Sequence, residues 1–361
     1  MGLYVVLHSK LAHHIYEGLD GRLLRPTLVT QSVEKGDCLL HLFRSPPQTM
    51  LNNTQLRYYD SEVLRLPRET RTLYHAQVDR LIDALSKSVR ARTSIKITKV
   101  VKAGSFAKFT ILRKSSEDPV DVDVVFYISG KDVDAETLES LSTEIFDLLT
   151  HLYPQKSVED FQFQKKAATV VFKGTGLSVD IVPVIEIPEE PGYGYQFGRD
   201  GSKTKTCAPC QIAVVTTRKN NDPDFRTLVR LGKKWRNYTE IKPLKSFHIE
   251  LIFAHLQDVN GKATSIQQRF FDFLLFIAQT ELKQPIQFPE NKGVVSKFTD
   301  PVVIIDPVNG ENNTAARISD EERKSIVAAA TEAWETAHFA SVEDDLAVWK
   351  ELFGPRFKVS D

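Results

Sequence analysis

The sequence predicts an α+β protein, in which a half that contains a β-sheet precedes a half made of helices. Segments with the period-two alternation of strands lie between about residues 95 and 185, and helical periodicity dominates after about residue 220. The 361 residues are 42% hydrophobic and 26% charged, which are ordinary globular proportions. At about 150 residues per domain, this length suggests two domains.

We expect three segments along the chain. Residues 1–57 form an irregular N-terminal extension that need not belong to the fold, 58–190 form the sheet-containing half, and 191–361 form the helical half. Met50 is the only methionine after Met1, which suggests the hypothesis that translation begins at Met50.

The sheet-containing half is expected to begin with a long amphipathic helix that serves as its spine. Hydrophobic residues recur at spacings of three and four over about 69–91. A tight Lys-Gly-Thr-Gly turn at 173–176 predicts an antiparallel hairpin between the last two strands. The remaining expected elements are strands at 95–101, 120–128, 169–172 and 177–184, a short helix at 106–113 and a helix at 135–153.

The second half follows a polar, glycine-rich loop at 188–206 and is expected to be helical. Ser319 and Glu322 have the spacing of a capping box, which marks the start of one helix. The expected helices cover about 222–238, 243–258, 265–282, 319–339 and 342–353.

Charge and cysteine content exclude several classes of protein. The net charge is zero and the isoelectric point is about 7.1, so we expect no dedicated nucleic-acid binding surface. Three cysteines are too few for a disulfide framework, which points to a reducing compartment. No apolar run reaches 18 residues, so we expect a cytoplasmic protein without membrane spans. Cys207-x-x-Cys210 is half of a zinc site without a second half, and we expect neither a metal nor a redox function there.

Three short segments carry candidate chemistry. Gly104-Ser105 follows a strand and precedes a short helix, where a glycine allows close approach of a phosphate and the hydroxyl can donate to it; alone, such a pair is more often a plain turn. Asp121 and Asp123 share one face of a strand, and their mutual repulsion would be relieved by Mg²⁺. A solvent-facing pair is the alternative. Asp180 is a lone charge in an apolar strand and needs a cation, donors or a cleft.

In this order, with Asp121 sixteen residues after Ser105, the segments resemble the nucleotidyltransferase superfamily of DNA polymerase β type. The resemblance implies that three carboxylates hold two metal ions, Mg²⁺ with Mn²⁺ as an alternative. Asp121 and Asp123 would bind both ions. Asp180 would bind the catalytic one and help to deprotonate the acceptor 3′-hydroxyl.

The second half resembles that of oligoadenylate-synthase-type enzymes. Among these, the chain is most similar to bacterial cyclic oligonucleotide synthases, relatives of cyclic GMP–AMP synthase in anti-phage signalling, and to their HORMA-associated clade. The resemblance covers about 60–358. It implies a second-messenger synthase that makes cyclic triadenylate from ATP, accepts other nucleoside triphosphates as alternatives, and is activated by a HORMA-domain protein. The segments that carry it are 229–235, 245–251 and 306–313, with 127–130, 176–184 and 352–354 for the clade.

The resemblance also implies a nucleotide site. Residues 226–245 hold seven Lys or Arg against one acidic residue, which suits a triphosphate; a solvated helix face is the alternative. Asn309, Asn312 and Asn313 would read a base edge or cap a loop. Apart from Gly104 and Ser105, the expected contacts are Lys108, Lys233, Lys245 and Ser246 to the triphosphate or its surroundings and Phe247 stacked on a base.

One residue departs from the family pattern, and two other functions stay open. Phe109 stands where the usual Gly-Ser-x-x-Lys-Gly-Thr has its second glycine, so close backbone approach is expected to be lost there. One alternative is an RNA-extending enzyme of the CCA-adding or poly(A) type. The other is a catalytically silent nucleotide-binding module.

Overall fold

The computed structural model describes residues 51–114, 119–129, 135–163, 167–197, 202–262, 264–291, 297–343 and 346–360. The extension up to residue 50, and with it the proposed start at Met50, lies outside the described residues.

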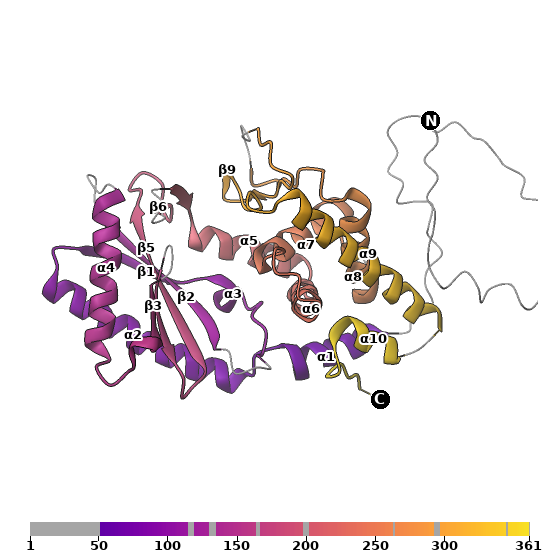
Figure 1. Cartoon of the computed structure of the whole chain (residues 1–361), viewed down its shortest axis with the longest axis horizontal. Helices are drawn as coiled ribbons and strands as arrows, with labels where there is room; N and C mark the ends of the chain where they lie inside the picture. Colours follow the sequence, from indigo (N-terminus) through magenta and orange to yellow (C-terminus); the bar gives the residue numbers. More distant parts are fainter. Residues whose placement is uncertain are drawn as a thin grey trace, which may run out of the picture. The chain divides into compact units, whose positions relative to one another are not determined.

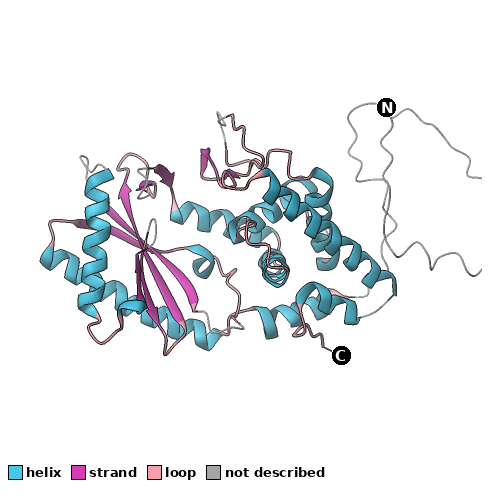
Figure 2. Ribbon diagram, in the orientation of Figure 1, coloured by secondary structure: helices cyan, strands magenta, loops and turns pink. Residues whose placement is uncertain are grey.

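One sheet of seven strands organises the first half (Figure 2). Its main path is β1-β2-β5-β4-β3, and β6 and β7 extend it from the end of β5. β2 and β5 run parallel, whereas the other pairs are antiparallel. The strands are β1 (Lys96–Lys102), β2 (Val120–Ser129), β3 (Phe161–Phe163), β4 (Ala168–Phe172), β5 (Leu177–Glu186), β6 (Gly194–Phe197) and β7 (Lys203–Thr206).

The core of this half lies between one face of the sheet and two helices, α2 (Arg68–Arg92) and α4 (Ala135–Leu152), which run beside the strands in Figure 1. Buried side chains of both helices pack on valines and isoleucines of β2 and β5. Burying each such side chain contributes roughly 1.5–3 kcal/mol. Successive side chains of a strand point to opposite faces of the sheet. Every second residue of β2 and β5 therefore lies on the face that α2 and α4 do not cover.

The second half is helical and has an aromatic core. Gly232 lies where α6 meets α7: a Cβ there would come within 2.7 Å of Ile249 and 2.8 Å of Phe253, so only glycine fits. Rings such as Phe253 and Phe273 stack at 4.4 Å in the same core. The elements are α5 (Ala208–Asn221), α6 (Phe225–Tyr238), α7 (Ser246–Asn260), α8 (Ile266–Thr280), β8 (Ile305–Asp306), β9 (Asn309–Asn313), α9 (Asp320–Glu343) and α10 (Leu346–Phe353).

Residues 51–57 correct one expectation. Helix α1 (Asn53–Tyr59) begins with a capping box between Asn52 and Gln55 and is followed by a short π-helix, η3 (Asp60–Leu64). Leu51 and Leu56 are buried in the core of the helical half. The expectation that the irregular extension reaches residue 57 was therefore wrong for 51–57, because so short a helix shows too few apolar repeats. The division at 190 stays a prediction.

Most other elements agree with the expectations. The spine helix, the hairpin of β4 and β5 and the Ser319–Glu322 capping box are confirmed. β6, β7 and α5 were missed, since the two strands are short and polar and α5 begins with a proline in its first turn. The short helix ends at Ala107 (α3, Gly104–Ala107) instead of 113. No helix in the described part of the chain is long and apolar enough to cross a membrane.

Candidate active site

The three predicted carboxylates lie on one face of two neighbouring strands. Asp123 of β2 pairs with Asp180 of β5 in the parallel register, and Asp121 pairs with Ser178. The residues that alternate with the aspartates along each strand, such as Val122 and Val124 of β2, are buried against α2 and α4. Asp121 is exposed, and Asp123 and Asp180 are partly buried. The alternation that builds the core thus brings the carboxylates together on the opposite face.

The electrostatics of this group favour a cation. Burial, followed by the charges of Asp180 and Asp121, raises the pKa of Asp123 to about 6. Burial also raises the pKa of Asp180, although a 2.6 Å hydrogen bond from the Thr169 hydroxyl opposes this shift. Carboxylates that repel one another in a partly dehydrated place are stabilised by a shared cation.

The side chains of the three aspartates are not arranged as a complete set of metal ligands. Among the described residues, no group of three His, Cys, Asp or Glu side chains is close enough to hold a metal ion as arranged. Asp121 instead lies 3.8 Å from the ammonium of Lys114, and Asp180 accepts the bond from Thr169. The donor set still fits a hard divalent cation, because it consists of carboxylate oxygens on one face of two neighbouring strands.

The Gly104 turn lies directly against these carboxylates. Gly104 has a positive φ of 61°, and a Cβ there would overlap the carboxylate of Asp123. The amide of Ala103 donates to the Asp123 carbonyl at 2.7 Å, which fixes the turn to β2. The amides of Thr110 and Ile111 both donate to the Ser105 carbonyl, which closes the loop that follows. The structure therefore joins the Gly-Ser turn and the aspartates in one place.

Lys108, Lys233 and Phe247 meet beside this turn. The Lys108 ammonium lies 2.5 Å from a carboxylate oxygen of Glu250 and 4.6 Å from the centre of the Phe247 ring. Lys233 donates to the carbonyl and hydroxyl of Thr110, at 3.0 and 3.1 Å. Lys108, Lys233 and Glu250 are at most 5% exposed. Glu250 was missed by sequence reasoning, because nothing local marks its partner 142 residues away.

This cluster holds two ammonium groups and one carboxylate. Burial lowers the pKa of Lys233 to about 7, although the charge of Glu250 raises it. Lys108, Arg230 and Arg236 add to the lowering. The excess of positive charge in a buried setting is what an anionic group entering the site would neutralise.

Lys245 and Ser246 lie at the start of α7. Lys245 is exposed, and its ammonium donates to the carbonyl of Lys242. The Ser246 hydroxyl accepts a 3.0 Å bond from Arg236, one of the groups that lower the pKa of Lys233. The structure thus links Ser246 to the cationic cluster through an arginine.

The asparagines have different surroundings. The amide group of Asn313 donates to Asp300 and Val302, and its oxygen accepts from Ile304 and Ala315, so Asn313 holds its loop together. The Asn309 amide group donates to the Lys205 carbonyl in β7.

Asn312 donates a hydrogen bond to Asp306, a buried acid that the sequence analysis did not single out. Asp306 is 2% exposed and accepts hydrogen bonds from Gln211, Asn312 and the amide of Val308. Burial raises its pKa. The sequence signal of Asp306 was a charged residue in an apolar stretch, followed by proline and valine. Residue propensities alone do not distinguish this pattern from a turn.

Known proteins share both the sequence and this architecture. The Second Messenger Oligonucleotide or Dinucleotide Synthetase domain matches residues 50–220. The CBASS oligonucleotide cyclase CdnC of Escherichia coli (strain KTE188) is 62% identical over 312 residues, 86% of this chain and 99% of that protein. The chain belongs to this family of CBASS oligonucleotide cyclases.

A second relative and two solved structures come from the same E. coli strain. The Cyclic AMP-AMP-AMP synthase of E. coli (strain MS 115-1) is 31% identical over 319 residues, 85% of this chain and 98% of that protein. The structures of E. coli MS115-1 CdnC with ATP and with a HORMA protein both superpose with a TM-score of 0.73. Their identities are 29% and 30%, and they cover 86% of this chain and 100% and 99% of theirs, respectively.

The family assigns the activity class. The chain is a nucleotidyltransferase that makes a cyclic oligonucleotide in CBASS anti-phage signalling, and its family generally uses divalent metal ions. The predicted α+β fold of polymerase β type is confirmed.

Phe109 keeps a glycine-like backbone in this cyclase. Its φ is 60°, a conformation that costs a side-chain-bearing residue roughly 1–2 kcal/mol. The Phe109 carbonyl accepts a 2.5 Å bond from Arg230, and the guanidinium carbons of Arg71 and Arg226 lie 4.5 and 4.9 Å from its ring centre. Phe109 therefore adopts the left-handed backbone that favours glycine, with arginines around its ring.

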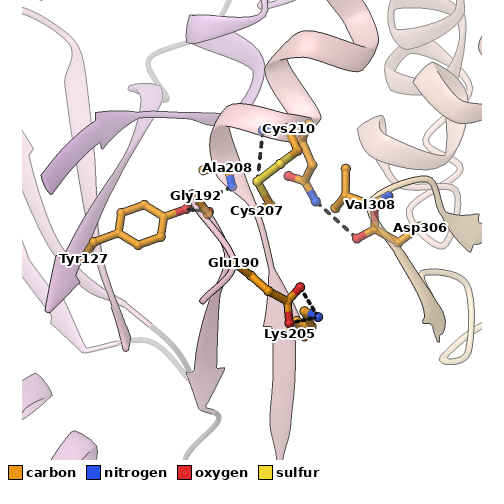
Figure 3. Close-up of a disulfide and its surroundings, with 10 residues drawn as sticks. Tyr127, Glu190, Gly192, Lys205, Cys207, Ala208, Cys210, Asp306 and Val308 are labelled. Carbon is orange, nitrogen blue, oxygen red and sulfur yellow. Dashed lines mark hydrogen bonds and ion pairs between the residues drawn. A yellow bond between two sulfur atoms is a disulfide. The ribbon is translucent and has the colours of Figure 1, made fainter. Parts of the chain in front are cut away.

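The cysteines of the cyclase correct a further expectation. Cys207 and Cys210 form a disulfide, with their Cα atoms 5.2 Å apart (Figure 3). Cys207 is the N-cap of α5, and this position brings the two sulfurs within bonding range. The expectation of no redox chemistry at Cys207-x-x-Cys210 assumed reduced cysteines, which the sequence could not test.

Proposed function

We propose that this cyclase joins ATP through 3′,5′-bonds into cyclic triadenylate, using two Mg²⁺ ions, or Mn²⁺ as an alternative, at Asp121, Asp123 and Asp180. The observation that carries the proposal is the register of β2 and β5, which pairs Asp123 with Asp180 beside the Gly104 turn. The name of the 31% identical relative, Cyclic AMP-AMP-AMP synthase, supports the product, and the solved structure of E. coli MS115-1 CdnC with ATP supports the substrate.

Each carboxylate has a role in this proposal. Asp121 and Asp123 would hold both ions, and Asp180 would hold the catalytic one and help to deprotonate the acceptor 3′-hydroxyl. When bound, the ions supply Lewis-acid stabilisation of the charge that develops on the phosphate oxygens. Asp180 keeps its orientation through the Thr169 hydroxyl, 2.6 Å away.

The remaining residues of the site bind and orient the nucleotide. Gly104 gives the backbone room for the phosphate, and the Ser105 hydroxyl donates to it. Lys108 and Lys233 neutralise the triphosphate, which carries about four negative charges. The other proposed contacts are those of Lys245 and Ser246 with the triphosphate, Phe247 with a base face and Asn309 and Asn312 with a base edge.

Phe247, the proposed stacking partner of a base, already contacts a cation of the site. Its ring lies 4.6 Å from the Lys108 ammonium, so one aromatic face is held by a cation at the edge of the cluster. Stacking of a base on such a ring contributes roughly 1–3 kcal/mol.

We propose a HORMA-domain protein as the activator. The proposed location of the enzyme is the cytoplasm. The support is the solved complex of the MS115-1 relative with a HORMA protein. Other nucleoside triphosphates are proposed as secondary substrates.

The direct test is product analysis. The chain is incubated with labelled ATP and Mg²⁺, with and without a peptide-bound HORMA protein, and products are identified by mass spectrometry. We expect three AMP units in a ring that resists phosphatase because it has no terminal phosphate. Linear products alone would refute cyclisation, and growth of an added RNA primer would favour the RNA-extending alternative. The Asp121→Ala/Asp123→Ala variant is the control, and if it changed neither turnover nor the in-cell phenotype, the silent module would be favoured.

A further inference from the structure

The Cys207–Cys210 disulfide has no role in the proposed reaction, yet it lies at a junction of the fold. It closes the first turn of α5, directly after β7, the last strand of the sheet (Figure 3). The amide of Cys210 donates to the sulfur of Cys207 at 3.2 Å. Cys207 is fully buried, whereas Cys210 is partly exposed. Of the two residues, only Cys210 has exposed surface that a small reagent can reach.

The turn that carries the disulfide is fixed to the sheet by Tyr127. The Tyr127 hydroxyl accepts a 3.2 Å bond from the amide of Ala208 and donates at 2.8 Å to the carbonyl of Gly192 (Figure 3). Gly192 has a φ of 86°, and a Cβ there would lie 3.3 Å from the Cys207 sulfur. Tyr127 belongs to β2, the strand of Asp121 and Asp123.

The same turn supports the Gly104 turn. Ala208, next to Cys207, is buried in a small cluster with Ala103, Val125 and Val184. Ala103 is the residue directly before Gly104 and the N-cap of α3. A loosened first turn of α5 therefore removes packing from the residue on which the Gly104 turn begins.

A third connection leads to the other half of the site. Gln211 follows Cys210 directly and donates to the buried carboxylate of Asp306 at 3.2 Å. Asp306 also accepts a bond from Asn312. The few residues around the disulfide thus contact β2, the Gly104 turn and the β8–β9 segment.

We propose that Cys207 and Cys210 are a site of reversible thiol oxidation by small-molecule disulfides, and that the disulfide form holds the first turn of α5 and, through Ala103, the Gly104 turn. The consequence for ATP binding rests on the proposed function, whereas the oxidation and its effect on the turn do not.

The chemistry balances with one small-molecule disulfide as the oxidant. The Cys210 thiolate attacks one of its sulfurs, which forms a mixed disulfide and releases the first thiolate. The Cys207 thiolate then attacks the Cys210 sulfur and releases the second. Two protein thiols lose two electrons and two protons, and the oxidant leaves as two thiols. The N-terminus of α5 assists, since it stabilises thiolates.

The oxidation is tested by intact mass. A Cys38→Ser variant leaves only the pair, and it is equilibrated in glutathione buffers from fully reduced to fully oxidised, quenched in acid and alkylated. We expect a single transition from two alkyl groups to none. Two alkyl groups in excess oxidised glutathione, or none in excess reduced glutathione, would overturn the proposal.

The structural effect is tested by hydrogen exchange over residues 103–110. We expect slower exchange in the oxidised Cys38→Ser chain than in the reduced one, and about fivefold tighter ATP binding. The matched control adds Cys207→Ser and Cys210→Ser to the Cys38→Ser chain: serine at position 207 keeps an N-cap acceptor, and no thiol is left to oxidise, so its exchange should equal the reduced form in both buffers.

Two results separate this proposal from the proposed function. Equal exchange of residues 103–110 in the two redox states would overturn the redox proposal, whatever the activity. Slower exchange in the oxidised state, in a chain that binds no ATP in either state, would support the redox proposal and refute the proposed function.

Discussion

Asp123 pairs with Asp180 across the parallel strands β2 and β5, and burial together with the charge of Asp180 raises the pKa of Asp123 to about 6. The pairing places two carboxylates closer than their charges favour, next to a turn that only glycine fits. An arrangement that is unfavourable without a cation is consistent with a site built to bind one.

Asp123→Asn should abolish cyclisation with little loss of the folded state. Substitution of a residue that only contacts a metal ligand typically lowers metal affinity or activity about 10–100-fold. Loss of a ligand itself should therefore lower activity more than about 100-fold. The variant keeps the shape of the side chain and removes a charge that is repelled by Asp180 and Asp121. Product formation and thermal unfolding are measured together. Asp83→Asn, on the exposed face of α2, is the control.

Gly104→Ala should inactivate the enzyme, because a Cβ at Gly104 overlaps the Asp123 carboxylate and the φ of 61° disfavours alanine. The matched control is Gly174→Ala, where a Cβ has nothing within 4 Å. We expect normal product formation from the control and at least a tenfold loss in the variant, about 1.4 kcal/mol in barrier height. Equal activity of the two variants would show that the turn does not shape the site.

Glu250→Gln should affect both stability and ATP binding. The carboxylate lies 2.5 Å from Lys108 in a buried place, and breaking one partner of a buried pair costs about 3–5 kcal/mol. Urea unfolding measures this loss. The KM for ATP should also rise, because Lys108 loses the group that orients it. Exposed Glu321→Gln is the control, and a variant with unchanged KM would remove Glu250 from the account of the site.

Lys233 should give the KM for ATP a pH dependence. Burial lowers its pKa from 10.5 to about 7, so in the free enzyme the ammonium is lost as the pH rises through 7. If only the charged form holds the triphosphate, the KM should rise by up to about tenfold per pH unit above this value. Lys233→Met should have a high KM without this dependence; the same slope in the variant would assign the titration to another group.

The lowered pKa of Lys233 also affects stability: ATP binding should weaken as the pH rises, whereas the folded state should become more stable. Between pH 7 and 10.5 the unfolded chain keeps the Lys233 proton while the folded chain has released it. The unfolded state then binds more protons, so the contribution of Lys233 to the free energy of unfolding rises with pH in this window. Comparing the pH dependence of unfolding in wild type and Lys233→Met checks it.

The sequence was sufficient for the parts of the fold that repeat locally. Period-two alternation placed Asp121 and Asp123 on one face, and the three-and-four spacing located α2 within a residue or two. Glu250 could not be found, since its partner Lys108 is 142 residues away and no short pattern marks a buried ion pair. Asp306 could not be found because its burial and its bond from Gln211, 95 residues away, depend on the tertiary fold.

Helix α5 and its disulfide escaped prediction for two other reasons. The helix has a proline in its first turn and its apolar residues show no clear stripe, so periodicity did not reveal it. The state of Cys207 and Cys210 depends on the three-dimensional approach of two sulfurs, which residue types and spacing alone do not fix.

Metal binding by the three aspartates is the central claim, and a Mn²⁺ titration followed by electron paramagnetic resonance tests it most directly. The chain is titrated with a non-hydrolysable ATP analogue present, beside the Asp121→Asn/Asp123→Asn variant. We expect about two tightly bound ions in the wild type and loss of this binding in the variant. Equal Mn²⁺ affinity in both proteins would contradict the account.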